Sequence, residues 1–231
     1  MTDLSMAAGT PPVKTKRAVM IYSRYERFWH WSQAILIFVL AMSGFAVHGS
    51  LPFVKFGTAV TIHSWAAIAL IVLWIFTTFW HFTTGQWRQY LPQLSGLPAV
   101  IRFYAWGILT GAPHPYSKTL RRKQNALQSL AYLFFMVLIG PALWSTGIVY
   151  LAYPLWANWA IGTIGLPAVA FLHTAAAFLM VTFVIIHVYM TTTGKTVTHY
   201  VKTMITGYDA IELTAAEAAY LEEEKSGLLK K

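Results

Sequence analysis

Four long apolar segments constrain the fold of this chain more than any other feature of its sequence. About 20 apolar residues in a helix cross the hydrocarbon core of a bilayer, because each residue adds about 1.5 Å. Only 11% of the 231 residues are charged, whereas a soluble domain carries about a quarter. The sequence therefore predicts an all-α membrane protein, a bundle of four transmembrane helices. The segments run about Trp31–Val47, Val60–Phe82, Ala126–Ala152 and Pro167–Met190.

Basic residues are distributed unevenly among the connections between these segments. The connections 48–59 and 153–166 hold only Lys55, and the other flanking regions hold many. The positive-inside rule then predicts that both termini and the long central loop are cytoplasmic. The same distribution accounts for the formal charge of +9, so we expect no nucleic-acid partner. The flanking residues are Lys14, Lys16, Arg17, Arg24 and Arg27, then Arg88, Arg102, Lys118, Arg121, Arg122 and Lys123, then Lys195 and Lys202.

The sequence as a whole is predicted to divide into three regions. Residues 1–20 are expected to be a disordered cytoplasmic tail, residues 21–205 the four-helix domain, and residues 206–231 a cytoplasmic helix and tail. Thr214 and Glu217 have capping-box spacing, which favours a helix start there. The aromatic and basic stretch Leu97–Leu109 is typical of a short helix lying in the membrane interface. Pro141 and Gly147 predict a kink in the third span.

Two histidines in the fourth apolar segment suggest a cofactor. His173 and His187 are 14 residues apart, which places them about 21 Å apart along a helix and within about 40° of one face. By topology, His30 lies level with His187, and His63 lies level with His173. Two imidazoles that face each other across a helix bundle are suitable axial ligands for haem iron. Because the chain has no cysteine, any metal must bind histidine, methionine or oxygen. The pattern predicts two haems, one near each membrane surface.

Other roles for the histidines stay open. Histidines in a haem-free structural anchor would bond between helices, and in a small transporter they would relay protons. The spans contain no carboxylate except Glu26 at the start of the first, which argues against a cation transporter. His81 could replace His30 as a ligand, line a quinone pocket or lie at the headgroup level, and His48 is its counterpart at the outer end. Nothing in the sequence suggests that His114 or His199 is a ligand.

Three motifs resemble the four-helix, di-haem cytochrome b subunits of respiratory formate dehydrogenases, [NiFe]-hydrogenases and thiosulfate reductases. The segment "RFWHW", residues 27–31, is similar to the start of that family's first helix. The spacing His173…His187 matches its last helix, and "KQNALQ", residues 123–128, is similar to the entry to its third helix. The likeness covers about Tyr22 to Lys202. It departs from the family in the short connection between His30 and His63 and in the additional His48 and His81.

The resemblance implies a b-type cytochrome subunit in the inner membrane of a bacterium or archaeon. His30 and His187 would bind the haem on the cytoplasmic side, and His63 and His173 the outer haem. A quinone would react near Asn125 and Gln128, although Asn125 could equally cap the third span. An iron–sulfur or multihaem subunit, joined to a catalytic subunit, would exchange electrons with the outer haem. The expected function is electron transfer between that partner and the quinone pool, with quinone oxidoreduction as the only chemistry of this chain.

Overall fold

The computed structural model describes residues 14–92, 94–113, 115–116, 118–119, 122–158 and 162–230. Within these ranges lie four helical stretches that are long and apolar enough to span a membrane. They confirm the predicted all-α bundle of four transmembrane helices. The stretches are Arg24–Val47, Phe56–Thr84, Ala126–Leu151 and Gly165–Thr191.

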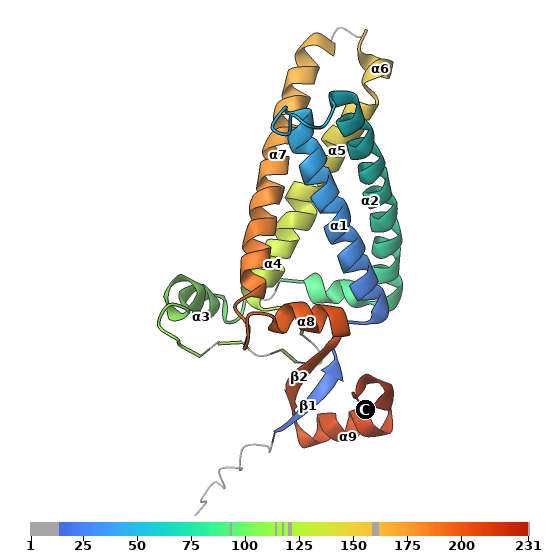
Figure 1. Cartoon of the computed structure of the whole chain (residues 1–231). Helices are drawn as coiled ribbons and strands as arrows, with labels where there is room; N and C mark the ends of the chain where they lie inside the picture. Colours follow the sequence, from blue (N-terminus) through green and yellow to red (C-terminus); the bar gives the residue numbers. More distant parts are fainter. Residues whose placement is uncertain are drawn as a thin grey trace, which may run out of the picture.

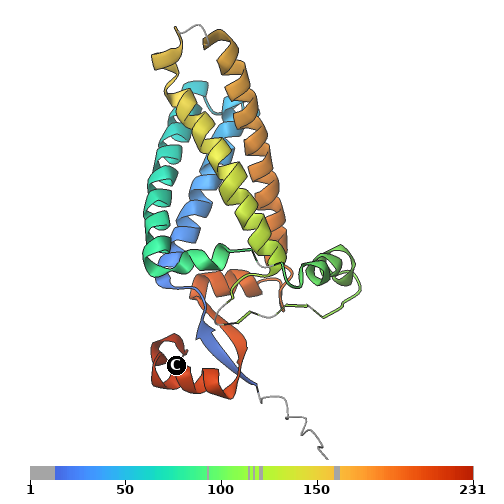
Figure 2. The same cartoon turned by 180° about the vertical axis from the view of Figure 1, so that it is seen from behind.

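The four spans form two packed pairs. Helix α1 (Arg24–Val47) packs along α2 (Phe56–Thr84), and α5 (Gly140–Leu151) packs along α7 (Gly162–Thr191). Figures 1 and 2 show that the α1–α2 and α5–α7 connections lie at one end of the bundle, here called the far end. The far end includes the short helix α6 (Tyr153–Trp156). The opposite end, here called the basic end, carries the remaining short elements (Figure 1).

The third span is not one continuous α-helix. It consists of α4 (Ala126–Phe134), the π-helical segment η3 (Phe135–Ile139) and α5. Pro141 has no backbone N–H and its ring clashes with the preceding turn, so the helix must adjust just before it. The N–H of Gly140 donates to the carbonyl of Phe135, and a Cβ at Gly140 would lie 3.3 Å from that oxygen. The irregularity predicted from Pro141 therefore lies one turn earlier, at η3.

Short helices at the basic end surround the ends of the spans. The helix predicted over Leu97–Leu109 is present as α3 (Leu97–Arg102) followed by the π-helical η2 (Phe103–Gly107). Ile101 and Trp106 on this segment are exposed, and Figure 1 shows α3 beside the bundle, level with the ends of the spans. This position suits a helix in the membrane interface. The other helices here are η1 (Gln86–Tyr90) and α8 (His199–Thr206).

A two-stranded sheet corrects the expectation of a disordered tail through residue 20. Strand β1 (Thr15–Met20) pairs antiparallel with β2 (Tyr208–Leu213). Alternate β2 residues point inward, and they form a small core with Val19, Ile21 and Leu221. Helix α9 (Ala215–Glu223), followed by η4 (Ser226–Leu228), covers this core. The Thr214–Glu217 capping box at the start of α9 confirms the predicted helix. Residues 1–13 lie outside the described ranges.

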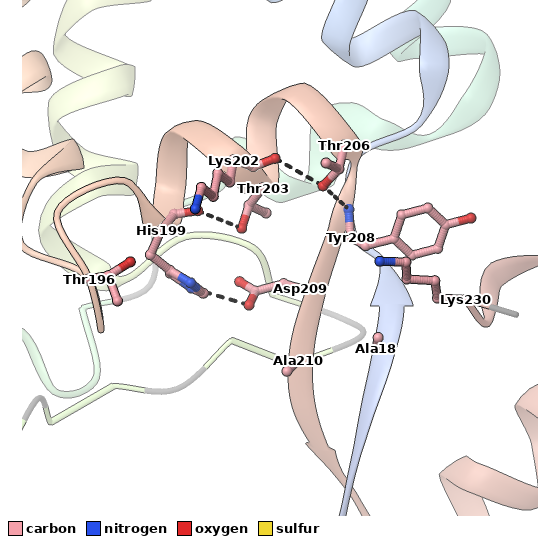
Figure 3. Close-up of a pocket in the computed structure, with 10 residues that line it drawn as sticks. All are labelled: Ala18, Thr196, His199, Lys202, Thr203, Thr206, Tyr208, Asp209, Ala210 and Lys230. Atoms are coloured by element: carbon pink, nitrogen blue, oxygen red, sulfur yellow. Dashed lines mark hydrogen bonds and ion pairs between the residues drawn. The ribbon is translucent and has the colours of Figure 1, made fainter.

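Ion pairs with little exposure hold the basic end together. The ammonium of Lys118 lies 3.0 Å from Asp209 and 4.6 Å from the centre of the Tyr200 ring. His199 Nε2 lies 3.2 Å from the other oxygen of Asp209, and the two side chains face each other in Figure 3. Burial lowers the pKa of Lys118, although Asp209 opposes the shift. These contacts connect the central loop, α8 and β2 below the bundle.

Candidate functional site

Four histidines from three spans form two ring pairs. The rings of His30 and His187 have their centres 6.1 Å apart, at an interplanar angle of 47°. The rings of His63 and His173 have their centres 6.2 Å apart, at 70°. The structure thus brings together the ring pairs expected from depth and helix face. We call His30–His187 the basic-end pair and His63–His173 the far-end pair.

The separation of the rings fits two axial ligands on one metal ion. A metal–imidazole bond of about 2 Å, plus about 1 Å from the nitrogen to the ring centre, places each ring centre about 3 Å from the metal. Two rings on opposite sides of haem iron are then about 6 Å apart. Both observed pairs have this separation. The four imidazoles therefore suit bis-histidine ligation.

Hydroxyl groups hold the second ring nitrogen of each far-end histidine. His63 Nδ1 lies 3.0 Å from Ser43 Oγ, and His173 Nδ1 lies 2.8 Å from Thr146 Oγ1. Each hydroxyl donates its own proton to a carbonyl one turn earlier, Val39 for Ser43 and Ala142 for Thr146. A hydroxyl that donates in this way has its lone pairs free to accept from an Nδ1–H. The arrangement therefore favours the tautomer in which Nε2 carries the lone pair that a metal requires.

A glycine follows each of these hydroxyl residues. A Cβ on Gly44 would lie 3.6 Å from Cε1 of His63, and one on Gly147 would lie 3.5 Å from Cε1 of His173. Each imidazole thus lies where a methyl group on the glycine of the neighbouring helix would just make van der Waals contact with it. The dipeptides Ser43-Gly44 and Thr146-Gly147 are visible in the sequence, but sequence reasoning did not identify them as parts of the site.

The basic-end pair is held differently. His187 stacks on Phe183, with ring centres 6.1 Å apart at 11°, and lies 6.3 Å from the Tyr132 ring. His30 Nδ1 is buried and has no hydrogen-bond partner in the described part of the chain. Trp29 Nε1 and Gln33 Oε1, beside it on α1, are also buried without a partner there. Unpaired polar atoms of this kind are rare in protein interiors, and a bound group or water is the usual explanation.

Asn125 and Gln128 form a capping box at the start of α4. The Gln128 N–H donates to Asn125 Oδ1 at 2.8 Å, and the Asn125 N–H donates to Gln128 Oε1 at 3.0 Å. Asn125 is only 2% exposed, and its Nδ2 lies 3.5 Å from the Tyr104 hydroxyl. It nevertheless lines a cavity at the basic end, together with residues such as Arg88 and Ser129. Asn125 can therefore cap α4 and also contact a ligand in this cavity.

The other histidines belong to neither ring pair. His81 is buried, with Nδ1 2.7 Å from the Thr77 carbonyl and Nε2 3.3 Å from the Tyr90 hydroxyl. It does not line the cavity beside Asn125. His48 is exposed at the end of α1, 3.5 Å from Thr174. His199 pairs with Asp209, and His114 lies outside the described residues.

Comparison with known proteins identifies a family that this chain matches and a protein to which it is similar. Residues 21–207 match the family described as prokaryotic cytochrome b561. The chain is also similar to the Escherichia coli K12 protein named "Putative cytochrome YdhU". The two are 31% identical over 203 residues, which cover 82% of this chain and 74% of that protein.

Proposed function

Because the chain belongs to the prokaryotic cytochrome b561 family, we propose that its four paired histidines bind two b-type haems in series. Membership makes the chain a b-type cytochrome, a multi-pass bacterial membrane protein that takes part in electron transfer. The observation that supports two haems is the separation of the two ring pairs, 6.1 and 6.2 Å. Family membership argues against a haem-free anchor and against a histidine relay in a transporter.

The residues divide between the two proposed sites by their depth in the membrane. His63 and His173 would hold the far-end haem, and His30 and His187 the basic-end haem. Each haem supplies one-electron transfer when bound. The chain orients the imidazoles and surrounds them with apolar helices. The 14-residue spacing of His173 and His187 along α7 corresponds to about 21 Å, so the proposed haems connect the two leaflets.

The partners at the two ends are part of the same proposal. At the far end, an iron–sulfur or multihaem subunit joined to a catalytic subunit would exchange electrons with the chain. The resemblance favours partners of the formate dehydrogenase, [NiFe]-hydrogenase or thiosulfate reductase type, in the inner membrane. At the basic end, a quinone would react in the cavity beside Asn125 and Gln128, where an amide can donate to a quinone carbonyl. His81 is the alternative quinone contact.

The visible spectrum of the purified protein tests the haem proposal. We expect a Soret band, a sharp α-band of b type on reduction, and about two haems per chain. The His173→Ala variant should lose the far-end haem and retain one haem. His48→Ala is the matched control, because His48 is exposed and outside both ring pairs, and it should retain two. A colourless protein, or unchanged haem content in His173→Ala, would overturn the assignment.

A further inference from the structure

The two histidine pairs differ in what lies behind their rings. The Nδ1 of each far-end imidazole lies within hydrogen-bond distance of a hydroxyl, Ser43 at 3.0 Å and Thr146 at 2.8 Å, and a protonated Nδ1 would donate to it. Ser43 and Thr146 are themselves nearly buried, at 6% and 8% exposure. At the basic end, His30 Nδ1 has no such acceptor among the described residues. The proposed haem sites are therefore unequal in their outer hydrogen bonds.

This difference affects the electron affinity of the iron. An imidazole that donates its N–H to an acceptor gains electron density and becomes a stronger ligand. A stronger donor stabilises the ferric ion more than the ferrous ion, which lowers the reduction potential. Hydrogen bonding around the ligands is one of the means by which a protein tunes haem potential. Two such bonds act on the far-end haem.

The charge distribution acts in the same direction. Lys118, Lys123 and Lys202 lie at the basic end, whereas Lys55 is the only basic residue in the far-end connections. Reduction removes one positive charge from a haem, so nearby cations favour the reduced state, more strongly where the surroundings are apolar. Glu26 and Asp209 neutralise some of these cations, but the sequence retains a net positive charge. This effect raises the potential of the basic-end haem.

We propose that Ser43 and Thr146 are positioning residues that keep the reduction potential of the far-end haem below that of the basic-end haem. The inference rests on the proposed function, since it requires two haems. Transfer of one electron from the far-end haem to the basic-end haem would leave the first ferric and the second ferrous. Two electrons and two protons would then convert one quinone to quinol, with the far-end redox subunit as the reductant. The chain would thus carry electrons toward the basic end and reduce quinone.

A spectroscopic redox titration of the purified haem-loaded protein tests this order. Ser43→Ala and Thr146→Val each remove one acceptor and should raise the potential of the lower-potential haem, with the larger shift in the double variant. The higher-potential haem should not move. Thr146→Ser keeps the hydroxyl and should restore the original potential. The His173→Ala protein, which would retain only the basic-end haem, should titrate with the higher component alone.

Ser145→Ala supplies the matched control. Ser145 precedes Thr146 and donates to the carbonyl of Pro141 in the same way, but it is not bonded to His173. It should leave both potentials unchanged. Unchanged potentials in the double variant, or a shift of the higher component, would overturn the inference while leaving the two-haem proposal intact. Loss of a haem from Ser43→Ala or Thr146→Val would also overturn the inference, because the hydroxyls would then serve to retain the haem. A wild-type protein without two haems would refute the proposed function itself.

Discussion

Gly44 and Gly147 lie on the helices that pack against the far-end imidazoles, beside the rings of His63 and His173. The added Cβ of an alanine would make ordinary van der Waals contact with either ring, at 3.6 and 3.5 Å. A branched side chain would extend beyond the Cβ into the ring itself, and a close-packed interior has little room to yield. Only a small side chain can therefore be accommodated at either position. The imidazole sets this limit, and the backbone conformation does not.

Gly147→Leu tests this restriction. The leucine side chain should displace His173 and reduce the haem content from about two per chain to about one. Gly57→Leu is the control, because nothing lies within 4 Å of a Cβ at Gly57, and it should retain both haems. The measurement is haem per protein by absorbance. Two haems in Gly147→Leu would show that the ring has more freedom than its contacts indicate.

Asn125 caps α4 and is proposed to contact quinone, and a pair of substitutions separates these two roles. Serine is a good N-cap but lacks the amide donor, whereas alanine lacks both. If the amide binds quinone, Asn125→Ser and Asn125→Ala should both weaken inhibition by a quinone analogue, with both haems retained. Alanine alone should also lower the stability of α4, by about 1 kcal/mol. Inhibition that is unchanged in both variants would move the quinone contact elsewhere, with His81 next to be tested.

Sequence could predict the ring pairs but not their supports. The depth and face of His30, His63, His173 and His187 follow from helix geometry and the order of the spans. Ser43 acts on a histidine 20 residues away, and Thr146 on one 27 residues away. Serine and threonine that bond to their own helix are common in spans, so neither was distinctive. Only the packing of α1 on α2 and of α5 on α7 reveals which hydroxyls reach a ring.

At the scale of elements, the main surprise is the sheet. Strand β1 has six residues and contains Lys16 and Arg17, a composition that is also common in a disordered tail. Its partner β2 lies almost 200 residues later, so no local pattern links them. The long apolar helices, in contrast, satisfy their backbone hydrogen bonds internally and could be predicted from local sequence.

Asp209 is the element-scale test, because its carboxylate joins β2 to the central loop and to α8. Asp209→Asn would leave Lys118 buried without its counter-charge, and removing one partner of a buried pair costs about 3 kcal/mol or more. We expect faster amide hydrogen exchange in β1 and β2, with the spans unaffected. Arg17→Gln is the control, because the Arg17–Glu222 pair is more than half exposed on both sides, and exposed pairs contribute about 0–1 kcal/mol. Equal exchange in both variants would contradict this role.

The whole molecule is polarised between its two ends. Figures 1 and 2 show the sheet, α3, α8 and α9 gathered at the basic end, while the described residues at the far end form short connections and α6. The positive-inside rule predicts that the basic end faces the cytoplasm. The far end would then present its proposed haem to a partner outside, and the basic end would present the proposed quinone cavity inside.

Cysteine labelling tests this orientation directly, because the sequence contains no cysteine. Ser50→Cys lies in the α1–α2 connection, and Ser226→Cys lies in η4. In intact spheroplasts, a membrane-impermeant maleimide should label the first and not the second. Permeabilised cells should label both. The reverse pattern would show that the molecule has the opposite orientation, with the proposed quinone cavity outside.

Pairing β1 with β2 also imposes an order on assembly. The two strands cannot meet until residue 213 has left the ribosome, by which time all four spans have been made. Until then Val19 and Ile21 have no companions to cover them, and a chain interrupted before β2 would keep this segment open to proteases. Closure of the sheet can therefore occur only in chains that extend through β2, after all four spans have been synthesised.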